Sequence, residues 1–290
     1  MLILIADAFD DRMPHRLARF GEVTSDLARL ADAEVLLVRS KTKVRRDMID
    51  AAPKLKLIIR GGVGLDSIDV EYARGRGIDV RNTADASTTA VAELTLGLML
   101  ALVSHIPRAD ASLRERQWLK KELERSELSG KTLGILGLGR IGLAVATRAR
   151  AFQMRVLGYH PDVNFTDFAE IVGSREELLH ESDFVSLHMP LVPATRGCIN
   201  KKTLAQFRRG AFLVNTSRGE IIVEQDVADA LRSGQLGGYA CDVFTPEPPR
   251  DSPLFEAPNT VFTPHIGAST RENMERIGVV VERLLEAHSG

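Results

Sequence analysis

Lys131-Thr132-Leu133-Gly134-Ile135-Leu136-Gly137-Leu138-Gly139-Arg140-Ile141-Gly142 is the stretch of sequence that decides the fold. An apolar run at 132–136 predicts a buried strand, and the glycine spacing GxGxxG follows it directly. A helical pattern at 141–152 and another apolar strand at 155–159 come next. This order of strand, glycine turn, helix and strand is typical of a unit that binds a dinucleotide.

The three glycines of the motif have separate roles. Gly137 permits the tight turn, Gly139 lets the backbone approach the pyrophosphate, and Gly142 allows the helix to pack closely on the strand. The N-terminus of the helix then presents free N–H groups to the phosphates. A lone GxGxxG also occurs in turns that only connect a strand to a helix, but the flanking elements here favour a cofactor site.

The second strand of this unit departs from the usual pattern at its end. An acidic residue is expected there, where it accepts hydrogen bonds from the adenosine ribose. The chain has His160 at this position and Asp162 two residues later, and no arginine cluster follows to bind a 2′-phosphate. We therefore expect NAD as the cofactor, with His160 and Asp162 as candidate ribose contacts.

Short apolar strands alternate with helical patterns along almost the whole chain. The predicted strands are 2–6, 34–38, 57–60, 132–136, 155–159, 184–188, 212–215, 239–243 and 260–263. Strands spaced by helices predict parallel sheets covered on both faces. We therefore predict a two-lobed α/β protein, with a Rossmann-type dinucleotide-binding domain at 85–266 and a smaller flavodoxin-like substrate-binding domain at 1–84, completed by 267–290. The chain would cross between the lobes twice, which would create a hinged cleft.

Composition argues against several classes of protein. The 290 residues are 44% apolar and 27% charged, as in ordinary soluble proteins, and 38 basic against 39 acidic residues give a net charge of −1. That balance disfavours nucleic acid and anionic membranes as partners. Two cysteines, Cys198 and Cys241, suit a reducing compartment, and no metal-ligand spacing is present. We expect a soluble, cytoplasmic protein without a metal site.

Three residues that could take part in catalysis each follow a predicted strand. Arg218 follows 212–215, Glu247 follows 239–243, and His265 follows 260–263. Because ligands bind outside the carboxyl ends of parallel strands, these side chains are expected to converge. His265 is suited to take the hydroxyl proton of a 2-hydroxy acid while hydride leaves the same carbon, with Glu247 orienting its ring and Arg218 binding the carboxylate. Taken singly, each residue is more often structural.

Several motifs, in order along the chain, resemble the D-isomer-specific 2-hydroxyacid dehydrogenase family. They are 134–142, His188-Met189-Pro190-Leu191, 215–219, 242–248 and 263–270. Within the family, 38–44, 60–66 and 267–270 are most like the D-3-phosphoglycerate dehydrogenases, in a short form without a C-terminal regulatory domain. The resemblance implies NAD-dependent oxidation of D-3-phosphoglycerate to 3-phosphohydroxypyruvate, the entry to serine biosynthesis.

The resemblance also implies roles for individual residues. Arg218, Glu247 and His265 would be catalytic, as their chemistry suggests. The cofactor contacts would be Gly137, Gly139, Arg140, Ile141, Gly142, His160, Asp162, His188, Pro190, Thr216, Asp242 and Gly267, with Asp242 holding the nicotinamide carboxamide. The substrate contacts would be Arg39, Arg60, Gly62, Val63 and Gly64, with the backbone at 62–64 on the carboxylate and the two arginines on the phosphate.

Two alternative functions and one oligomeric state are also predicted. A glyoxylate or hydroxypyruvate reductase, or another D-2-hydroxyacid dehydrogenase, would keep the chemistry and drop the phosphate. An NADH-sensing corepressor would keep the fold and respond to cofactor by assembly instead of turnover, although the intact set Arg218, Glu247 and His265 disfavours it. The helix at 91–104 is more apolar than one buried face requires, which predicts a homodimer.

Overall fold

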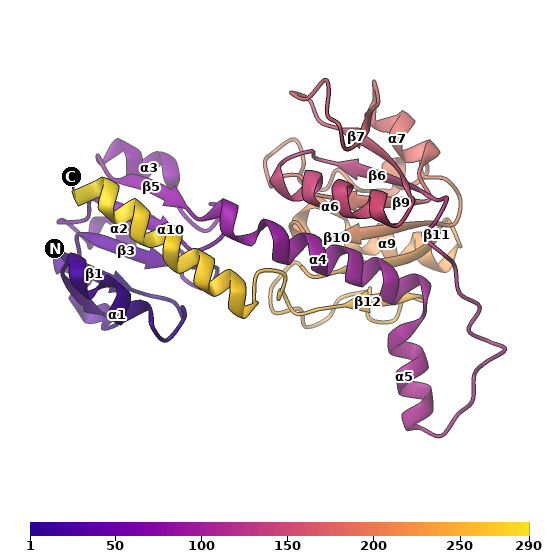
Figure 1. Cartoon of the computed structure of the whole chain (residues 1–290), viewed down its shortest axis with the longest axis horizontal. Coiled ribbons are helices and arrows are strands. Elements are labelled where there is room, and N and C mark those ends of the chain that lie inside the picture. Colours follow the sequence, from indigo (N-terminus) through magenta and orange to yellow (C-terminus); the bar gives the residue numbers. More distant parts are fainter. Residues whose placement is uncertain (290) are drawn as a thin grey trace. The chain divides into compact units, whose positions relative to one another are not determined.

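Runs of buried aliphatic residues form most strands of two all-parallel sheets in the computed structural model, which describes residues 1–289 (Figure 1). The chain divides into two units. Unit 1 comprises Met1–Ala90 with the C-terminal segment from Ala268, and unit 2 comprises Val91–Gly267.

Unit 1 contains a five-stranded sheet with the order β2-β1-β3-β4-β5, which is the flavodoxin-like order. Its strands are β1 (Leu2–Ile5), β2 (Glu22–Thr24), β3 (Val35–Val38), β4 (Leu57–Arg60) and β5 (Asp79–Asn82). Its own helices are α1 (Met13–Leu17), α2 (Arg46–Asp50), α3 (Val70–Gly75) and α10 (Arg271–Ser289). Successive strand residues point to opposite faces, so Leu4 and Leu36 pack in one core and Ile3 and Leu37 in the other.

Unit 2 contains a seven-stranded sheet with the order β12-β11-β10-β9-β6-β7-β8. Its strands are β6 (Thr132–Leu136), β7 (Arg155–Tyr159), β8 (Glu170–Ile171), β9 (Phe184–Leu187), β10 (Ala211–Asn215), β11 (Leu236–Cys241) and β12 (Thr260–Phe262). Its own helices are α5 (Ile106–Arg114), α6 (Arg140–Ala151), α7 (Arg175–Glu181), α8 (Lys201–Leu204) and α9 (Glu224–Arg232). Counted from β6, this is the classical Rossmann order with one strand added, and the order reverses between β6 and β9.

Helix α4 (Ala84–Val103) begins in unit 1 and continues into unit 2. It is long and apolar enough to span a membrane, but 61% of its most apolar window is buried inside the protein. Leu96, Leu98, Met99 and Leu102 pack in a core of unit 2. The apolar surface that predicted a partner subunit is therefore largely covered within the chain itself, so α4 is a core helix.

The predicted elements differ from the observed ones mainly at short strands. The sequence did not predict β2, β5 or β8, and β11 begins at Leu236 and ends at Cys241 instead of spanning 239–243. The apolar helix begins at Ala84, seven positions before the expected residue 91. In β5 only Val80 is buried, so this strand lacks the aliphatic run by which the others were found.

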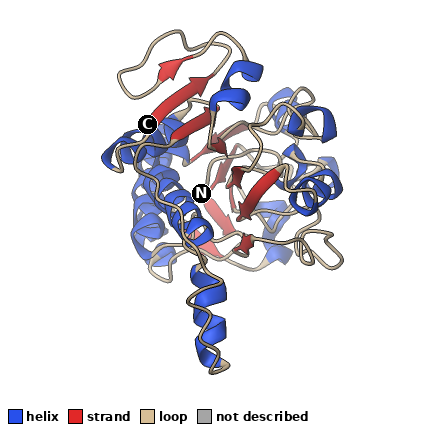
Figure 2. Ribbon diagram, turned by 90° about the vertical axis from the view of Figure 1, so that its right-hand side faces the viewer, coloured by secondary structure: helices blue, strands red, loops and turns tan. Residues whose placement is uncertain are grey.

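Helix α5 stands away from the sheet of unit 2 (Figures 1 and 2). Its side chains Ile106 and Leu113 are 53% and 58% exposed, and Trp118 in the following loop is 77% exposed. These are large apolar groups on a projecting segment. The dimer predicted from the helix at 91–104 did not involve these groups.

Candidate active site

The glycine turn between β6 and α6 has the geometry that a pyrophosphate requires. Gly137 has a φ of +100°, and a Cβ on it would come within 2.6 Å of the His188 carbonyl oxygen. A Cβ on Gly142 would overlap the carbonyl oxygen of Gly137. At Gly139, in contrast, a Cβ would meet nothing within 4 Å. Two glycines are therefore needed by the fold, while the third leaves open space above the backbone.

The N-cap residue of α6 has no side chain that could cap the helix. Gly139 is its N-cap residue, and Arg140 and Ile141 are the first residues of the helix. Their N–H groups have no carbonyl partner within the helix, as in every first helical turn. The site thus fits the diphosphate of a dinucleotide, which would be held by these N–H groups and the positive end of the helix dipole.

His160 follows β7, whose end lies directly beside the glycine turn. The Gly137 N–H donates to the Tyr159 carbonyl oxygen at 3.0 Å, which fixes this proximity. The His160 Nδ1 accepts a hydrogen bond from the Asp162 backbone N–H at 3.1 Å. Because Nδ1 acts as an acceptor, the ring of a neutral His160 carries its proton on Nε2 and presents a donor there. Asp162 itself is exposed.

His188 follows β9 on the other side of the glycine turn. Its backbone N–H donates to the Leu136 carbonyl oxygen at 2.8 Å, and its Nε2 lies 2.8 Å from the Ser186 Oγ. Burial lowers the pKa of His188 to about 4, so the ring is neutral at pH 7. Pro190, two residues further on, is exposed. The sequence did not single out Ser186, although a buried serine two residues before a histidine on a strand shares its face.

His265 and Glu247 form a hydrogen-bonded pair. The His265 Nδ1 lies 2.7 Å from the Glu247 Oε2, and the two side chains are 34% and 37% exposed. Burial alone would raise the pKa of Glu247, but hydrogen bonds from His265 and from the Phe244 N–H, with the charge of Arg218, hold this pKa below its usual value. An ionised Glu247 accepts a hydrogen bond from the Nδ1–H of His265. It thereby leaves the Nε2 lone pair of His265 as a base.

The backbone of His265 is held in a strained conformation by Asp242. His265 has a φ of +54°, and its N–H donates to the Asp242 carbonyl oxygen at 2.8 Å. The Asp242 carboxylate is almost completely buried and accepts from the Thr263 hydroxyl at 2.6 Å and from the Ile266 and Gly267 N–H groups at 2.8 and 2.7 Å. Asp242 therefore fixes the loop that carries His265. The sequence suggested a cofactor contact at Asp242 and did not predict this clamp.

Arg218 is presented by a turn that Asn215 organises at the end of β10. The Asn215 side chain accepts from the Ser217 N–H at 3.0 Å and donates to the Arg218 carbonyl oxygen at 2.9 Å. Asn215 is completely buried, and the sequence analysis did not single it out. An asparagine at a strand end two residues before a serine is typical of such a side-chain-closed turn, so the pattern was available.

Thr216 lies in the same turn and contacts helix α4. Its hydroxyl is 2.9 Å from the Thr95 hydroxyl, which donates its only proton to the Val91 carbonyl oxygen at 2.8 Å. Thr216 is therefore the donor in the pair, and its lone pairs stay available as acceptors. Within unit 2, the carboxyl ends of β6, β7, β9, β10, β11 and β12 thus carry all the predicted cofactor and catalytic residues.

The predicted substrate residues of unit 1 lie at the carboxyl ends of two paired strands. Val38 of β3 is in register with Arg60 of β4, so the backbones of Arg39 and Arg60 lie close together at one end of the sheet. Burial lowers the pKa of Arg39, and among residues 1–289 its side chain donates only to the Ala8 carbonyl oxygen, at 3.3 Å. A Cβ on Gly62, whose φ is +150°, would overlap the Arg60 guanidinium.

The loop after Gly62 is also fixed by side-chain contacts. The Asn82 side chain donates to the Val63 carbonyl oxygen at 2.6 Å, while Val63 and Gly64 themselves are at least partly exposed. The guanidinium of Arg39 loses water on burial and donates to a carbonyl oxygen, not to a carboxylate, so it is suited to bind an anion. Unit 1 thus holds two arginines and a glycine-rich loop at one end of its sheet.

Comparison with known proteins gives a consistent result. Residues 96–267 match the family model of the D-isomer specific 2-hydroxyacid dehydrogenase, NAD binding domain. The D-3-phosphoglycerate dehydrogenase of Methanocaldococcus jannaschii is 45% identical over 291 residues, which cover 96% of this chain and 56% of that protein. The hydroxypyruvate reductase of Thermotoga maritima is 46% identical over 261 residues, which cover 89% of this chain and 85% of that protein.

Solved structures extend the similarity to both units. The NADPH-dependent glyoxylate/hydroxypyruvate reductase of Sinorhizobium meliloti, in complex with NADP and malonate, has a TM-score of 0.89 and 28% identity, covering 99% of this chain and 92% of that one. The chain spans about half the length of the D-3-phosphoglycerate dehydrogenases that it matches. Relatives named for phosphorylated and for unphosphorylated substrates are thus similar to it at almost the same identity.

Proposed function

Because the chain belongs to the D-isomer-specific 2-hydroxyacid dehydrogenase family, we propose that it interconverts a D-2-hydroxy acid and its 2-keto acid, with NAD as the hydride acceptor and donor. The observation that carries this proposal is the 2.7 Å contact between the His265 Nδ1 and an ionised Glu247. This contact leaves Nε2 of His265 with a free lone pair, and Nε2 can therefore act as the base that the reaction requires. When bound, the nicotinamide supplies or accepts the hydride, and the protein supplies the remaining groups.

In the oxidation, His265 Nε2 takes the hydroxyl proton as the bond between the substrate carbon and its hydrogen breaks. Glu247 stabilises the imidazolium that forms, because its carboxylate lies against the Nδ1–H. Arg218 binds the substrate carboxylate and polarises the oxygen that becomes the keto group. In the reduction, the imidazolium returns the proton to that oxygen. Asp242 keeps His265 in place through the clamp on its loop.

The substitution His265→Gln tests the role of the base. Glutamine removes the titratable nitrogen while it preserves the polar character of the side chain. We expect turnover to fall by about two to four orders of magnitude, as for loss of a general base, while NADH binding measured by fluorescence stays unchanged. An NADH-sensing corepressor would bind NADH equally well in both forms and turn over no 2-keto acid in either. Turnover that survives in His265→Gln would refute the assignment.

For the substrate, we propose D-3-phosphoglycerate, which is oxidised to 3-phosphohydroxypyruvate in serine biosynthesis. Support comes from Arg39 and Arg60, which lie side by side at one end of the sheet of unit 1, and from the desolvated guanidinium of Arg39. A phosphate dianion would accept hydrogen bonds from both guanidinium groups. The similarity to a hydroxypyruvate reductase keeps an unphosphorylated substrate as the alternative.

The substitution Arg39→Ala distinguishes the two substrates. Loss of one charged contact to a phosphate is expected to lower kcat/KM for 3-phosphohydroxypyruvate by about tenfold or more, and to leave hydroxypyruvate and glyoxylate within about twofold. The nearby Lys43→Ala, an exposed charge on the same loop, is the control and should change neither. Equal losses for all three keto acids would show that Arg39 supports the fold and not the phosphate.

We propose a cytoplasmic homodimer as the working form. The two free cysteines, Cys198 and Cys241, are compatible with a reducing compartment. The exposed apolar groups of α5, and not α4, are the surface that supports a dimer. Light scattering after size exclusion is expected to give twice the mass of 31.8 kDa. The double substitution of Ile106 and Leu113 by Lys should then halve this mass, and a monomer in the unmodified protein would refute the dimer.

A further inference from the structure

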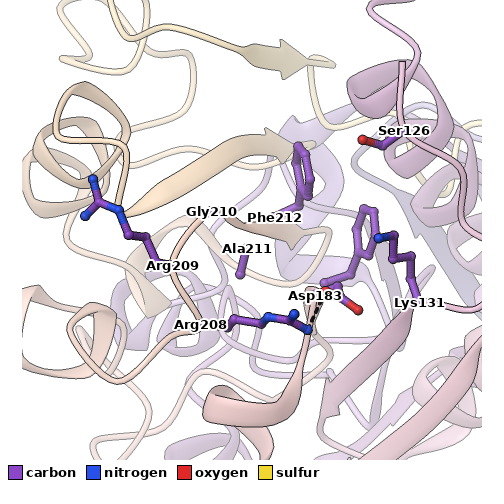
Figure 3. A pocket seen from close by; sticks show the side chains of 9 residues that line it. Ser126, Lys131, Asp183, Arg208, Arg209, Gly210, Ala211 and Phe212 are labelled. Atoms are coloured by element: carbon purple, nitrogen blue, oxygen red, sulfur yellow. Dashed lines mark hydrogen bonds and ion pairs between the residues drawn. The ribbon is translucent and has the colours of Figure 1, made fainter. Parts of the chain in front are cut away.

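A pocket lies at the amino end of the sheet of unit 2, opposite the end that carries the catalytic residues. It has a volume of about 140 Å³ and is formed where β6, β9 and β10 begin. We call it the basic pocket; Lys131, Asp183, Phe184, Arg208, Arg209 and Phe212 are its main lining residues (Figure 3). Because a water in the liquid takes up about 30 Å³, this space holds roughly four or five waters or one phosphate-sized group.

The only carboxylate of the basic pocket is already engaged. One oxygen of Asp183 accepts from the Arg208 guanidinium at 2.8 Å, and the other accepts from the Thr132 N–H at 2.9 Å (Figure 3). Asp183 therefore neutralises Arg208 and joins the start of β9 to the start of β6. It does not neutralise the other two cations at the rim.

Lys131 is a further cation of the basic pocket. Among residues 1–289, its ammonium makes no hydrogen bond and no ion pair, and it lies on the side of Asp183 away from Arg209 (Figure 3). Within the described part of the chain, the Arg209 side chain donates one hydrogen bond, to the Ser233 carbonyl oxygen at 3.3 Å. Lys131 thus gives the pocket an unbalanced positive charge, and Arg208 keeps N–H donors that its bond to Asp183 does not use.

The floor of the basic pocket is rigid and apolar. Phe184 and Phe212 stack with ring centroids 5.0 Å apart and planes 16° apart, and Ala211 is buried beside them. A low-dielectric wall strengthens the field of the cations at the rim, because water is excluded on one side. Donors held around such a wall are suited to a compact anion of high charge.

We propose that the basic pocket binds a small phosphate dianion, either free or as a phosphate monoester. Lys131 and the unused donors of Arg208 hold the phosphate oxygens, while the face of Phe212 contacts the carbon chain of an ester. The site is separate from the catalytic residues, which lie at the other end of the same strands. Each of these strands is only about five residues long, so the two ends are on the order of 15 Å apart.

Lysine acetylation, followed by mass spectrometry of the unmodified protein, tests this site directly. A bound phosphate hides the Lys131 ammonium, so at a phosphate concentration ten times its dissociation constant we expect acetylation of Lys131 to slow by about tenfold. Lys202 on α8 is the internal control, because it is exposed and lies outside the pocket. Sodium chloride at equal ionic strength should slow neither lysine.

Inorganic phosphate and glycerol 3-phosphate are the two probes, and both should protect Lys131. Tighter binding of the ester would indicate that Phe212 contributes, and tighter binding of inorganic phosphate would identify the free ion as the ligand; each result supports a phosphate site. Equal slowing of Lys131 and Lys202, or no slowing of Lys131, would overturn the proposal.

A second measurement separates the basic pocket from the substrate arginines of unit 1. Phosphate is expected to raise the thermal midpoint of the unmodified protein and of Lys202→Met, and to raise it less in Lys131→Met, because binding to the folded state stabilises it. Lys131 is exposed, so its loss leaves the fold intact. An equal rise in all three proteins would show that phosphate acts elsewhere and would contradict the proposal.

Discussion

His160 is the residue at which this chain departs from the usual dinucleotide pattern, and its hydrogen bond explains the consequence. The Nδ1 atom accepts from the Asp162 N–H, so the strand end offers a donor where a carboxylate would offer two acceptors. A carboxylate binds the ribose hydroxyls and repels a 2′-phosphate. His160 offers the ribose hydroxyls one donor and has no negative charge to repel a 2′-phosphate, which predicts weaker discrimination between NADH and NADPH.

The substitution His160→Asp is therefore expected to restore discrimination. The ratio of the NADPH to the NADH dissociation constant should rise by about tenfold or more, because the new carboxylate gains hydrogen bonds to one cofactor and repels the other. Fluorescence titration with each cofactor measures this ratio without turnover. The control is His180→Asp on α7, an exposed histidine away from the turn. An unchanged ratio would mean that residue 160 does not contact the ribose.

His188 makes stability depend on pH in a definite direction. Its pKa is about 4 in the folded protein because of burial, against an ordinary value of 6.5, so the unfolded chain takes up the proton first as the pH falls. Above pH 6.5, the protonation of His188 does not change the free energy of unfolding. Between pH 6.5 and 4 this free energy falls as the pH falls, by up to about 1.4 kcal/mol for each pH unit. Urea unfolding at pH 7 and pH 5 should show a smaller loss in His188→Gln, and equal losses would contradict the assignment.

At the scale of elements, two glycines of the turn between β6 and α6 are expected to serve different purposes. The fold requires Gly142, and the cofactor requires Gly139. Gly142→Ala places a methyl group against the Gly137 carbonyl oxygen, and we expect it to destabilise the protein by about 1–3 kcal/mol. Gly139→Ala meets nothing in the chain and should cost less than about 1 kcal/mol, the range for an N-cap change. It should still weaken NADH binding by at least about tenfold, because the methyl group occupies the space of the pyrophosphate.

Chemical denaturation and NADH titration of these two variants form one test. Retained NADH affinity in a stable Gly139→Ala would place the pyrophosphate somewhere other than the N-terminus of α6. A stable Gly142→Ala would show that the turn adapts to a methyl group.

The elements also show what a sequence can and cannot predict. The helix expected at 141–152 is observed at Arg140–Ala151, and the strand expected at 57–60 is exactly β4, because aliphatic runs and glycines act locally. Strands β5 and β8 were missed, since one has a single buried residue and the other has two residues in all. Strand ends identified the candidate site residues, but the Asp242 clamp and the Thr95–Thr216 contact join positions far apart in the chain. Local patterns carry no information on such contacts.

At the scale of the whole molecule, two sheets of different strand order each carry ligand-type residues at the carboxyl ends of their strands. Unit 1 offers Arg39 and Arg60, and unit 2 offers Arg218 with the pair of Glu247 and His265. In a dehydrogenase of this family, we expect the first set to select the substrate and the second to transfer its proton. The two functions should then be separable by substitution, as Arg39→Ala and His265→Gln are designed to show.

The central claim is that this chain turns over a 2-keto acid with NADH. Its most direct test is NADH consumption by the purified protein with 3-phosphohydroxypyruvate, run beside hydroxypyruvate and glyoxylate. We predict turnover, fastest with the phosphorylated acid, and its loss in His265→Gln. A protein that binds NADH but consumes none with any of the three acids would contradict the account.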